Sequence, residues 1–239
     1  MAGNIRPRHL KSRRILHTSD LHLASTKDKG CGSLISLVDA AKETRADLVV
    51  VAGDLFDYNS VRDDLVAFVV EQLRRLPGGV VILPGNHDCL EEGSVFDREE
   101  FRNGRANMRI LRTPGGETLD YPDLGISLWG KPIFSDNVRP LSGIPAPAPN
   151  DYWHIALAHG YYVSDPSPHF PSYHITADEI VNSGRDYVAL GHVPIFRCIC
   201  DRPVKAYYCG SLSTAGTVAM VDLVEETGVQ VTCYFLRDR

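Results

Sequence analysis

The chain has 239 residues, of which 44% are hydrophobic and 23% are charged, and its formal net charge is -5. This composition is that of an ordinary globular protein, so it excludes a disordered or fibrous chain. The acidic balance gives no general attraction to nucleic acid, whose nonspecific binding depends on Lys and Arg. A nucleic-acid substrate would therefore need a local basic patch or a partner.

The ends and the cysteines of the chain predict its surroundings. No apolar run approaches the roughly 20 residues of a membrane span, so no membrane contact is expected. Residues 1–12 form a basic arm without the apolar run of a secretory signal, and residues 13–239 are expected to form a single domain without an evident capping domain. The six cysteines are widely spread, which fits reduced thiols. We therefore expect a cytoplasmic protein.

In the first half of the chain, short apolar runs alternate with helical patterns. This alternation predicts strand-helix-strand units and a largely parallel sheet. Strands are expected at 14–18, 47–52 and 80–83. Helices are expected at 33–45, opened by Ser33, and at 61–76, where apolar residues recur at helical spacing until a Pro-Gly-Gly stop.

The second half reads mostly as strands. Short strands are expected around 108–111 and 125–130, and a helix at 176–183. After the proline-rich loop IPAPAPN, further strands are expected at 153–158, 186–190, 204–209, 217–224 and 229–236. Several consecutive short strands late in the chain predict a second, more antiparallel sheet packed on the first.

Five of the apolar strands run directly into side chains that suit metal binding. In open α/β sheets, ligands bind beyond the carboxyl ends of the strands, so chemistry is sought at these exits. The residues at the five exits are Asp20 and His22; Asp54; Asn86, His87 and Asp88; His159; and His192. Any one of them alone is commonly a turn, cap or structural residue, but their recurrence at five exits indicates a site.

The mixture of residue types indicates the chemistry. Carboxylates together with imidazoles suit borderline divalent ions, with manganese expected first and iron or zinc as alternatives. Two such ions roughly 4 Å apart can activate a water and neutralise charge in phosphoryl transfer, so that no nucleophilic side chain is needed. The chain also lacks G-x-S-x-G and the Walker loop. The sequence therefore predicts a metal-dependent phosphoesterase, while His17 and His154, which lie inside strands, are interpreted as structural.

The order of these motifs resembles a known family. D-x-H, G-D, G-N-H-D, a later His and G-H, over roughly residues 13–215, resemble the calcineurin-like metallophosphoesterases. The runs SDLHL, VVAGDLFD, LPGNHD and DYVALGH are most similar to nuclease subunits of SbcD type from bacterial DNA repair complexes. The resemblance implies a four-layer α/β/β/α sandwich: two mixed β-sheets flanked by helices, with the metal site at the C-terminal edge of the strands.

The resemblance also implies a role for each site residue. The implied ligands are Asp20 and His22 for the first metal, Asp54 as the bridge, and Asn86, His159 and His192 for the second metal. His87 would act beside the metals as a general acid or transition-state stabiliser. Asp88 is a candidate to orient the ring of His87.

One position departs from the family pattern. The family ends in G-H-x-H, whereas this chain has Gly191-His192-Val193-Pro194, so the last histidine of the first metal site is missing. Water can fill an open position on a catalytic metal, and His169 or His174 are alternative ligands. The first site is therefore expected to bind its metal weakly or to be vacant.

Three functions remain open on the sequence alone. The leading hypothesis is a nuclease-like phosphodiesterase, an exonuclease or endonuclease acting on DNA, for which a basic stretch offers a contact: Arg98, Arg102, Arg105, Arg109 and Arg112. The first alternative is a phosphatase or phosphodiesterase for a nucleotide or another small molecule. The second is a catalytically weak or inactive binding scaffold, because of Pro194. By analogy with the repair nucleases, a homodimer and an ATPase partner are also open.

Overall fold

Two six-stranded mixed sheets form the centre of the computed structural model, which describes residues 10–102, 107–134, 139–164 and 173–236. The first sheet contains, in spatial order, β14 (Gly228–Phe235), β13 (Thr217–Val224), β1 (Arg13–Thr18), β2 (Leu48–Ala52), β3 (Val80–Leu83) and β4 (Met108–Ile110). The second contains β11 (Phe196–Cys200), β12 (Lys205–Cys209), β10 (Tyr187–Gly191), β7 (Trp153–His159), β6 (Ile126–Gly130) and β5 (Glu117–Tyr121). A separate pair joins β8 (Tyr161–Tyr162) to β9 (His174–Ile175).

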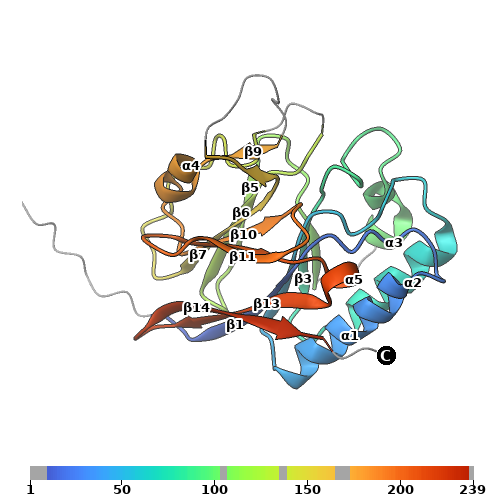
Figure 1. Ribbon diagram of the computed structural model, residues 1–239, viewed down its shortest axis with the longest axis horizontal. Coiled ribbons are helices and arrows are strands. Elements are labelled where there is room, and N and C mark those ends of the chain that lie inside the picture. Colours follow the sequence, from blue (N-terminus) through green and yellow to red (C-terminus); the bar gives the residue numbers. More distant parts are fainter. Residues whose placement is uncertain (1–9, 103–106, 135–138, 165–172, 237–239) are drawn as a thin grey trace, which may run out of the picture.

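Helices cover the outer faces of the two sheets. The helices are α1 (Lys29–Glu43), α2 (Asp63–Arg74), α3 (Glu99–Arg102), α4 (Ala177–Asn182) and α5 (Leu212–Ala215), with a 3-10 turn η1 at Val95–Asp97. Figure 1 shows α1 and α2 on one side of the paired sheets and α4 on the other. This is the predicted four-layer α/β/β/α arrangement, with a thinner fourth layer made by α4 and the β8-β9 pair. None of the described helices is long and apolar enough to span a membrane.

Strand β2 shows why the inner strands read as unbroken apolar runs. Successive side chains of a strand point to opposite faces. Val49 and Val51 pack in the cluster that includes α1 and α2, while Leu48 and Val50 pack in the cluster between the two sheets. Both faces are buried, so no polar alternation appears in the sequence.

The order of the late strands differs from the prediction. Strands β13 and β14 do not join the second sheet; β13 pairs antiparallel with β1, and β14 with β13. The second sheet is also no more antiparallel than the first, because β6, β7, β10 and β12 pair in parallel. The physical reason is burial on both faces of β13: Val218 packs on the helix side, whereas Ala219 and Val221 pack between the sheets.

Helix α1 begins at Lys29, four residues before the predicted start at Ser33. Gly30 and Gly32 lower the helix propensity of this turn, but tertiary packing overrides it. Cys31 is buried in the core, and a Cβ on Gly30 would lie 2.7 Å from Leu23 Cδ2. Glycine at this position therefore lets the helix start lie close to the segment that follows β1.

The two sheets meet at the edge where their parallel strands end. Gly191, the last residue of β10, approaches the end of β2 so closely that a Cβ there would lie 1.8 Å from the carbonyl oxygen of Ala52. Because no side chain fits between them, this glycine lets the exits of both sheets face one another. The residues that follow β1, β2, β3, β7 and β10 are thereby gathered in one place.

Candidate metal centre

The predicted ligands lie at strand exits whose backbone is strained. Six non-glycine residues in the described ranges have positive φ, and four of them are predicted ligands: Asp20 (54°), His22 (47°), Asp54 (55°) and His192 (94°). Such conformations cost about 1–3 kcal/mol each and persist where the surroundings hold them. Strain concentrated on ligand residues is typical of a functional site.

Four ligand-type atoms converge at the ends of β2, β3, β7 and β10. His159 Nε2 lies 3.1 Å from Asp54 Oδ2, 3.0 Å from Asn86 Oδ1 and 3.1 Å from His192 Nδ1. His159 is fully buried on its side chain and Asp54 almost so. The separations are those expected of atoms that share one small cation.

The surroundings of His159 favour positive charge at this point. Its Nδ1 lies 2.8 Å from the carbonyl oxygen of Ala52, which can only accept, so Nδ1 is the protonated nitrogen. In the neutral ring, Nε2 is then an acceptor, and it lies close to two other acceptors, the side-chain oxygens of Asp54 and Asn86. Burial opposes charge on the ring, yet the negative charges of Asp54 and Asp20 outweigh it and raise the pKa of His159 to about 9. A divalent metal can supply the positive charge in place of that proton.

His192 is suited to the same cation. Burial and the charge of His159 lower the pKa of His192 to about 4, so its imidazole is neutral, as metal ligation requires. Its Nε2 is buried and has no hydrogen-bond partner among the described residues. Asn86 completes this group with a side-chain oxygen.

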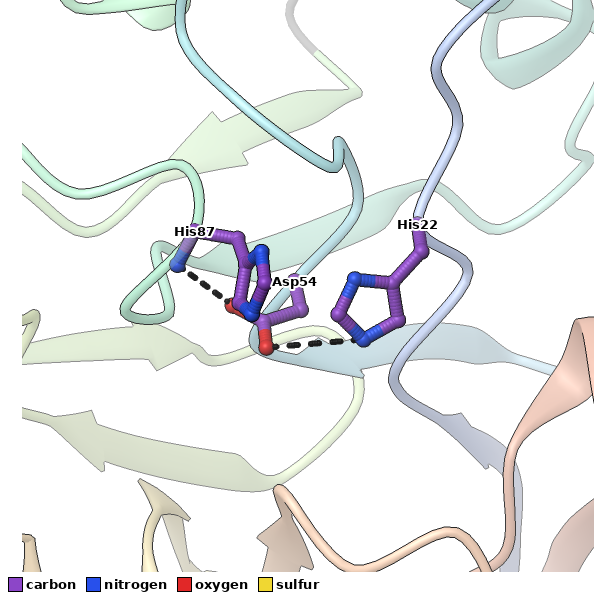
Figure 2. A group of neighbouring side chains, drawn as sticks. All are labelled: His22, Asp54 and His87. Carbon is purple, nitrogen blue, oxygen red and sulfur yellow. Dashed lines mark hydrogen bonds and ion pairs between the residues drawn. The ribbon is translucent and has the colours of Figure 1, made fainter.

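A second group of ligand-type atoms lies beside the first and shares Asp54 with it. Figure 2 shows Asp54 between His22 and His87. His22 Nε2 lies 3.7 Å from Asp54 Oδ2 and 3.8 Å from Asp20 Oδ1. The other oxygen of Asp54 accepts the backbone N–H of His87 at 3.0 Å. Hydrogen bonding to Asp20 raises the pKa of His22, which is again the signature of a place where positive charge is favoured.

The carboxylate of Asp57 contacts the rings of both His22 and His87. Asp57 Oδ1 lies 3.0 Å from His22 Nδ1 and 3.5 Å from His87 Nδ1, and the Asp57 carbonyl oxygen accepts from His87 Nδ1 at 2.9 Å. These contacts all involve Nδ1, so the Nε2 atom of each ring does not contact Asp57. A carboxylate on the far nitrogen of a ligating histidine is a common way of fixing its tautomer and orientation. Asp57 is not among the residues predicted from the sequence, although it closes the run Asp54-Leu-Phe-Asp57.

Asp88 has other partners. Its two oxygens accept the backbone N–H groups of Gly85 at 2.7 Å and Phe56 at 3.1 Å. Burial and the nearby charge of Asp54 raise the pKa of Asp88. Asp88 is fully buried and ties the turn after β3 to the segment after β2, while the ring of His87 contacts Asp57 and the ring of His22.

The residues present fit two divalent metals. The ligand atoms of His22, Asp54 and His87 lie within 4.8 Å of one another, and so do those of Asp54, His159 and His192. In both His22 and His159, Nδ1 contacts an acceptor outside the group of ligand atoms, and Nε2 faces into that group. This is how ligating histidines are usually held.

The position of the missing family histidine is occupied by the exposed Pro194, which offers no ligand. Of the two alternatives, His169 lies outside the described residues. His174 is buried in β9 and is not part of either group of ligand atoms found among the described residues. The structure instead places His87 beside His22 and Asp54.

Comparison with known proteins identifies the family of the chain. Residues 13–196 match the family described as calcineurin-like phosphoesterase. The chain belongs to the calcineurin-like phosphoesterase family. As a calcineurin-like phosphoesterase it is a mixed α/β protein of a hydrolase family whose members typically use two metals.

Two curated relatives are similar over about three quarters of this chain. The uncharacterized metallophosphoesterase YhaO of Bacillus subtilis is 29% identical over 203 residues, covering 74% of this chain and 48% of its own length. The DNA double-strand break repair protein Mre11 of Saccharolobus solfataricus is 26% identical over 192 residues, covering 75% of this chain and 49% of its own length. The chain therefore spans about half the length of these relatives.

Solved structures share the fold at low sequence identity. TT1561 of Thermus thermophilus has a TM-score of 0.61 at 14% identity, covering 95% of this chain and all of that one. An archaeal phosphodiesterase has a TM-score of 0.51 at 13% identity, covering 92% of this chain and 99% of that one. These likenesses concern the fold.

The arginines of the candidate DNA contact are dispersed and partly neutralised. Arg98 pairs with Asp63 at 3.1 Å, and Arg112 with Asp97 at 3.0 Å. Arg102 also faces Asp97, at 3.8 Å. Arg109 lies in β4, and Arg105 is outside the described residues. Among the described residues these cations are largely balanced by local carboxylates, which weakens the case for one basic DNA-binding patch.

Proposed function

We propose that this chain is a two-metal phosphodiesterase of nuclease type, cleaving phosphodiester bonds in DNA by means of a metal-activated water. The observation that carries the proposal is the position of Asp54 between His22 and His159, each of which is held by an acceptor on its other ring nitrogen. The likeness to Mre11, a DNA repair protein by name, favours DNA as the substrate.

The proposed ligands divide between two metals. Asp20 and His22 would hold the first, Asn86, His159 and His192 would hold the second, and Asp54 would contribute to both. Bound there, divalent ions supply positive charge for the phosphate and lower the pKa of the attacking water. Manganese is the first choice, with iron and zinc as alternatives, because the donor set mixes oxygen and nitrogen.

His87 acts on the substrate side of the proposed site. Its backbone N–H donates to Asp54, and its Nδ1 donates to the Asp57 carbonyl oxygen, so both the backbone and the ring of His87 are held. Nε2 is then the atom available to give a proton to a leaving oxygen or to stabilise charge on the phosphate. The half-exposed side chain leaves room for a substrate at this ring.

Asp57 is a positioning residue in this scheme, and its replacement should weaken the first metal. Asp57→Asn keeps the shape but removes the charge that favours Nδ1–H on His22 and His87. We expect metal affinity at the first site to fall by about 10- to 100-fold, as for other residues that orient ligands. Calorimetric titration with manganese measures this directly. Asp64→Asn, which removes an exposed carboxylate on α2, is the matched control and should leave both affinities unchanged; an unchanged affinity in Asp57→Asn would remove its positioning role.

The decisive test of function is hydrolysis of bis(p-nitrophenyl) phosphate by protein reloaded with manganese, compared with metal-stripped protein. Manganese-dependent turnover, with metal content measured in the same sample, is the expected result. Turnover of linear DNA is then compared with turnover of mononucleotides and cyclic nucleotides, which separates a nuclease from a small-molecule phosphatase. The small-molecule alternative is favoured by the net charge of -5 and by the pairing of Arg98 and Arg112 with carboxylates. No turnover with manganese, iron or zinc would favour the non-catalytic scaffold instead.

The proposal also covers the domain boundaries of the chain, its cellular location and its oligomeric state. In this proposal, residues 13–239 form one domain after the basic arm 1–12, most of which lies outside the described residues. A cytoplasmic location, a homodimer and an ATPase partner remain predictions drawn from the sequence and its resemblance. Size-exclusion chromatography with light scattering would test the dimer.

A further inference from the structure

Several exposed apolar residues lie close in the sequence to proposed metal ligands. Five large hydrophobic residues are exposed in the described ranges: Tyr58, Tyr161, Val181, Ile195 and Phe235. Three of them follow a proposed ligand closely, because Tyr58 comes four residues after Asp54, Tyr161 two after His159 and Ile195 three after His192. Single exposed apolar residues need no explanation, but apolar surface concentrated beside a ligand site indicates a binding role.

Tyr161 is the residue of this set whose position is best defined. Its ring meets the ring of His192 edge to face, with centroids 4.0 Å apart and an interplanar angle of 83°. The residue is nevertheless 51% exposed. Whichever ring presents its edge, at least one face of the tyrosine ring is not covered by His192.

The backbone around Tyr161 is rigidly held. Its N–H donates to the Tyr173 carbonyl oxygen at 2.8 Å, and the N–H of the next residue, Tyr162, donates to the hydroxyl of Tyr208 at 2.7 Å. That hydroxyl in turn donates to the carbonyl oxygen of Gly160 at 2.7 Å. An aromatic ring on a fixed backbone loses little conformational entropy when a flat ligand stacks on it, which strengthens binding.

From these contacts we infer that Tyr161 is a specificity-determining residue that stacks on a nucleobase attached to the phosphate in the metal centre. The inference rests on the proposed function and names the part of the substrate recognised beside the phosphate. A base can stack on a side chain only when it is free of its neighbours in a duplex. The site therefore takes an unstacked base, from a nucleotide or from a single-stranded or frayed end.

Binding measurements test the inference separately from hydrolysis. The full chain, loaded with manganese, is titrated by calorimetry with 2′-deoxyadenosine 5′-monophosphate and with 2-deoxyribose 5-phosphate, which lacks the base. Wild-type protein should bind the nucleotide about tenfold more tightly, as one stacked base contributes. Tyr161→Leu should abolish this preference by weakening only the nucleotide, whereas Tyr161→Phe, which keeps the aromatic face, should retain it.

Two controls make the result specific. Phe235→Leu removes an exposed aromatic ring at the end of β14 and should leave the preference intact, and the metal content of Tyr161→Leu should equal that of the wild type. If Tyr161→Leu binds both ligands equally more weakly, the residue merely supports His192. If the wild type binds the nucleotide no more tightly than the sugar phosphate, no base is recognised. Either result overturns the inference. A preference that depends on Tyr161 supports it even in protein that hydrolyses no diester. A single-stranded trinucleotide titrated alongside identifies a strand as the source if it binds more tightly than the mononucleotide, and a free nucleotide if it does not.

Discussion

Asp54→Asn is expected to lower phosphodiester hydrolysis by on the order of 10³-fold and to abolish the stabilisation of the protein by manganese. Asp54 is the one side chain common to both groups of ligand atoms, with one oxygen facing His159 and His22 and the other accepting from the backbone of His87. An amide of the same shape cannot bridge two cations as a carboxylate does. A loss of several kcal/mol of charge stabilisation corresponds to about that change in rate.

The stability effect gives a measurement that does not depend on activity. A metal that binds only the folded state adds about 2.7 kcal/mol to the free energy of unfolding when its free concentration is 100 times its dissociation constant. Urea unfolding with and without manganese should show this increment in the wild type and not in Asp54→Asn. Asp63→Asn, whose side chain is 90% exposed, is the matched control. An undiminished increment in Asp54→Asn would show that Asp54 is not a metal ligand.

The sequence predicts most of this site because one rule of sheet geometry places it. Parallel strands β1, β2, β3, β7 and β10 are apolar runs, and each has a candidate ligand at its last residue or within three residues after it. Once the strands are recognised, the carboxyl ends of the parallel strands of each sheet must share an edge. Glycine also marks the edge, since Gly191 permits the close approach of the two sheets there.

The contacts that the sequence did not predict depend on which strands become neighbours. The sequences of β13 and β14 predict a late pair of strands, and no local sequence feature indicates whether that pair joins β1 or the second sheet. Asp57 similarly lies on a loop, and only the folded chain brings its carboxylate to both His22 and His87. The sequence suggested Asp88 as the residue that orients the His87 ring because the two are adjacent. Successive side chains of a turn, however, point in different directions. Its carboxylate is turned to backbone N–H groups instead.

His87→Ala is expected to lower the rate of hydrolysis by about 10²- to 10⁴-fold, the usual contribution of a general acid, with little effect on stability or metal content. Its side chain is 42% exposed, so its removal leaves no buried cavity. Comparing two substrates separates its two candidate roles. A proton donor matters most for a poor leaving group, so the loss should be larger for a dinucleotide, which releases an alkoxide, than for bis(p-nitrophenyl) phosphate, which releases a stable phenolate.

The metal content of the same variant distinguishes this role from a second one that the structure permits. His87 lies within ligand distance of His22 and Asp54, and Pro194 stands where the family supplies the last histidine of that metal site. If His87→Ala binds one metal fewer than the wild type and loses activity equally on both substrates, His87 is the replacement ligand and not the proton donor. Full metal content with a leaving-group-dependent loss would assign the proton to His87 Nε2 and leave the first metal held by Asp20, His22 and Asp54 alone.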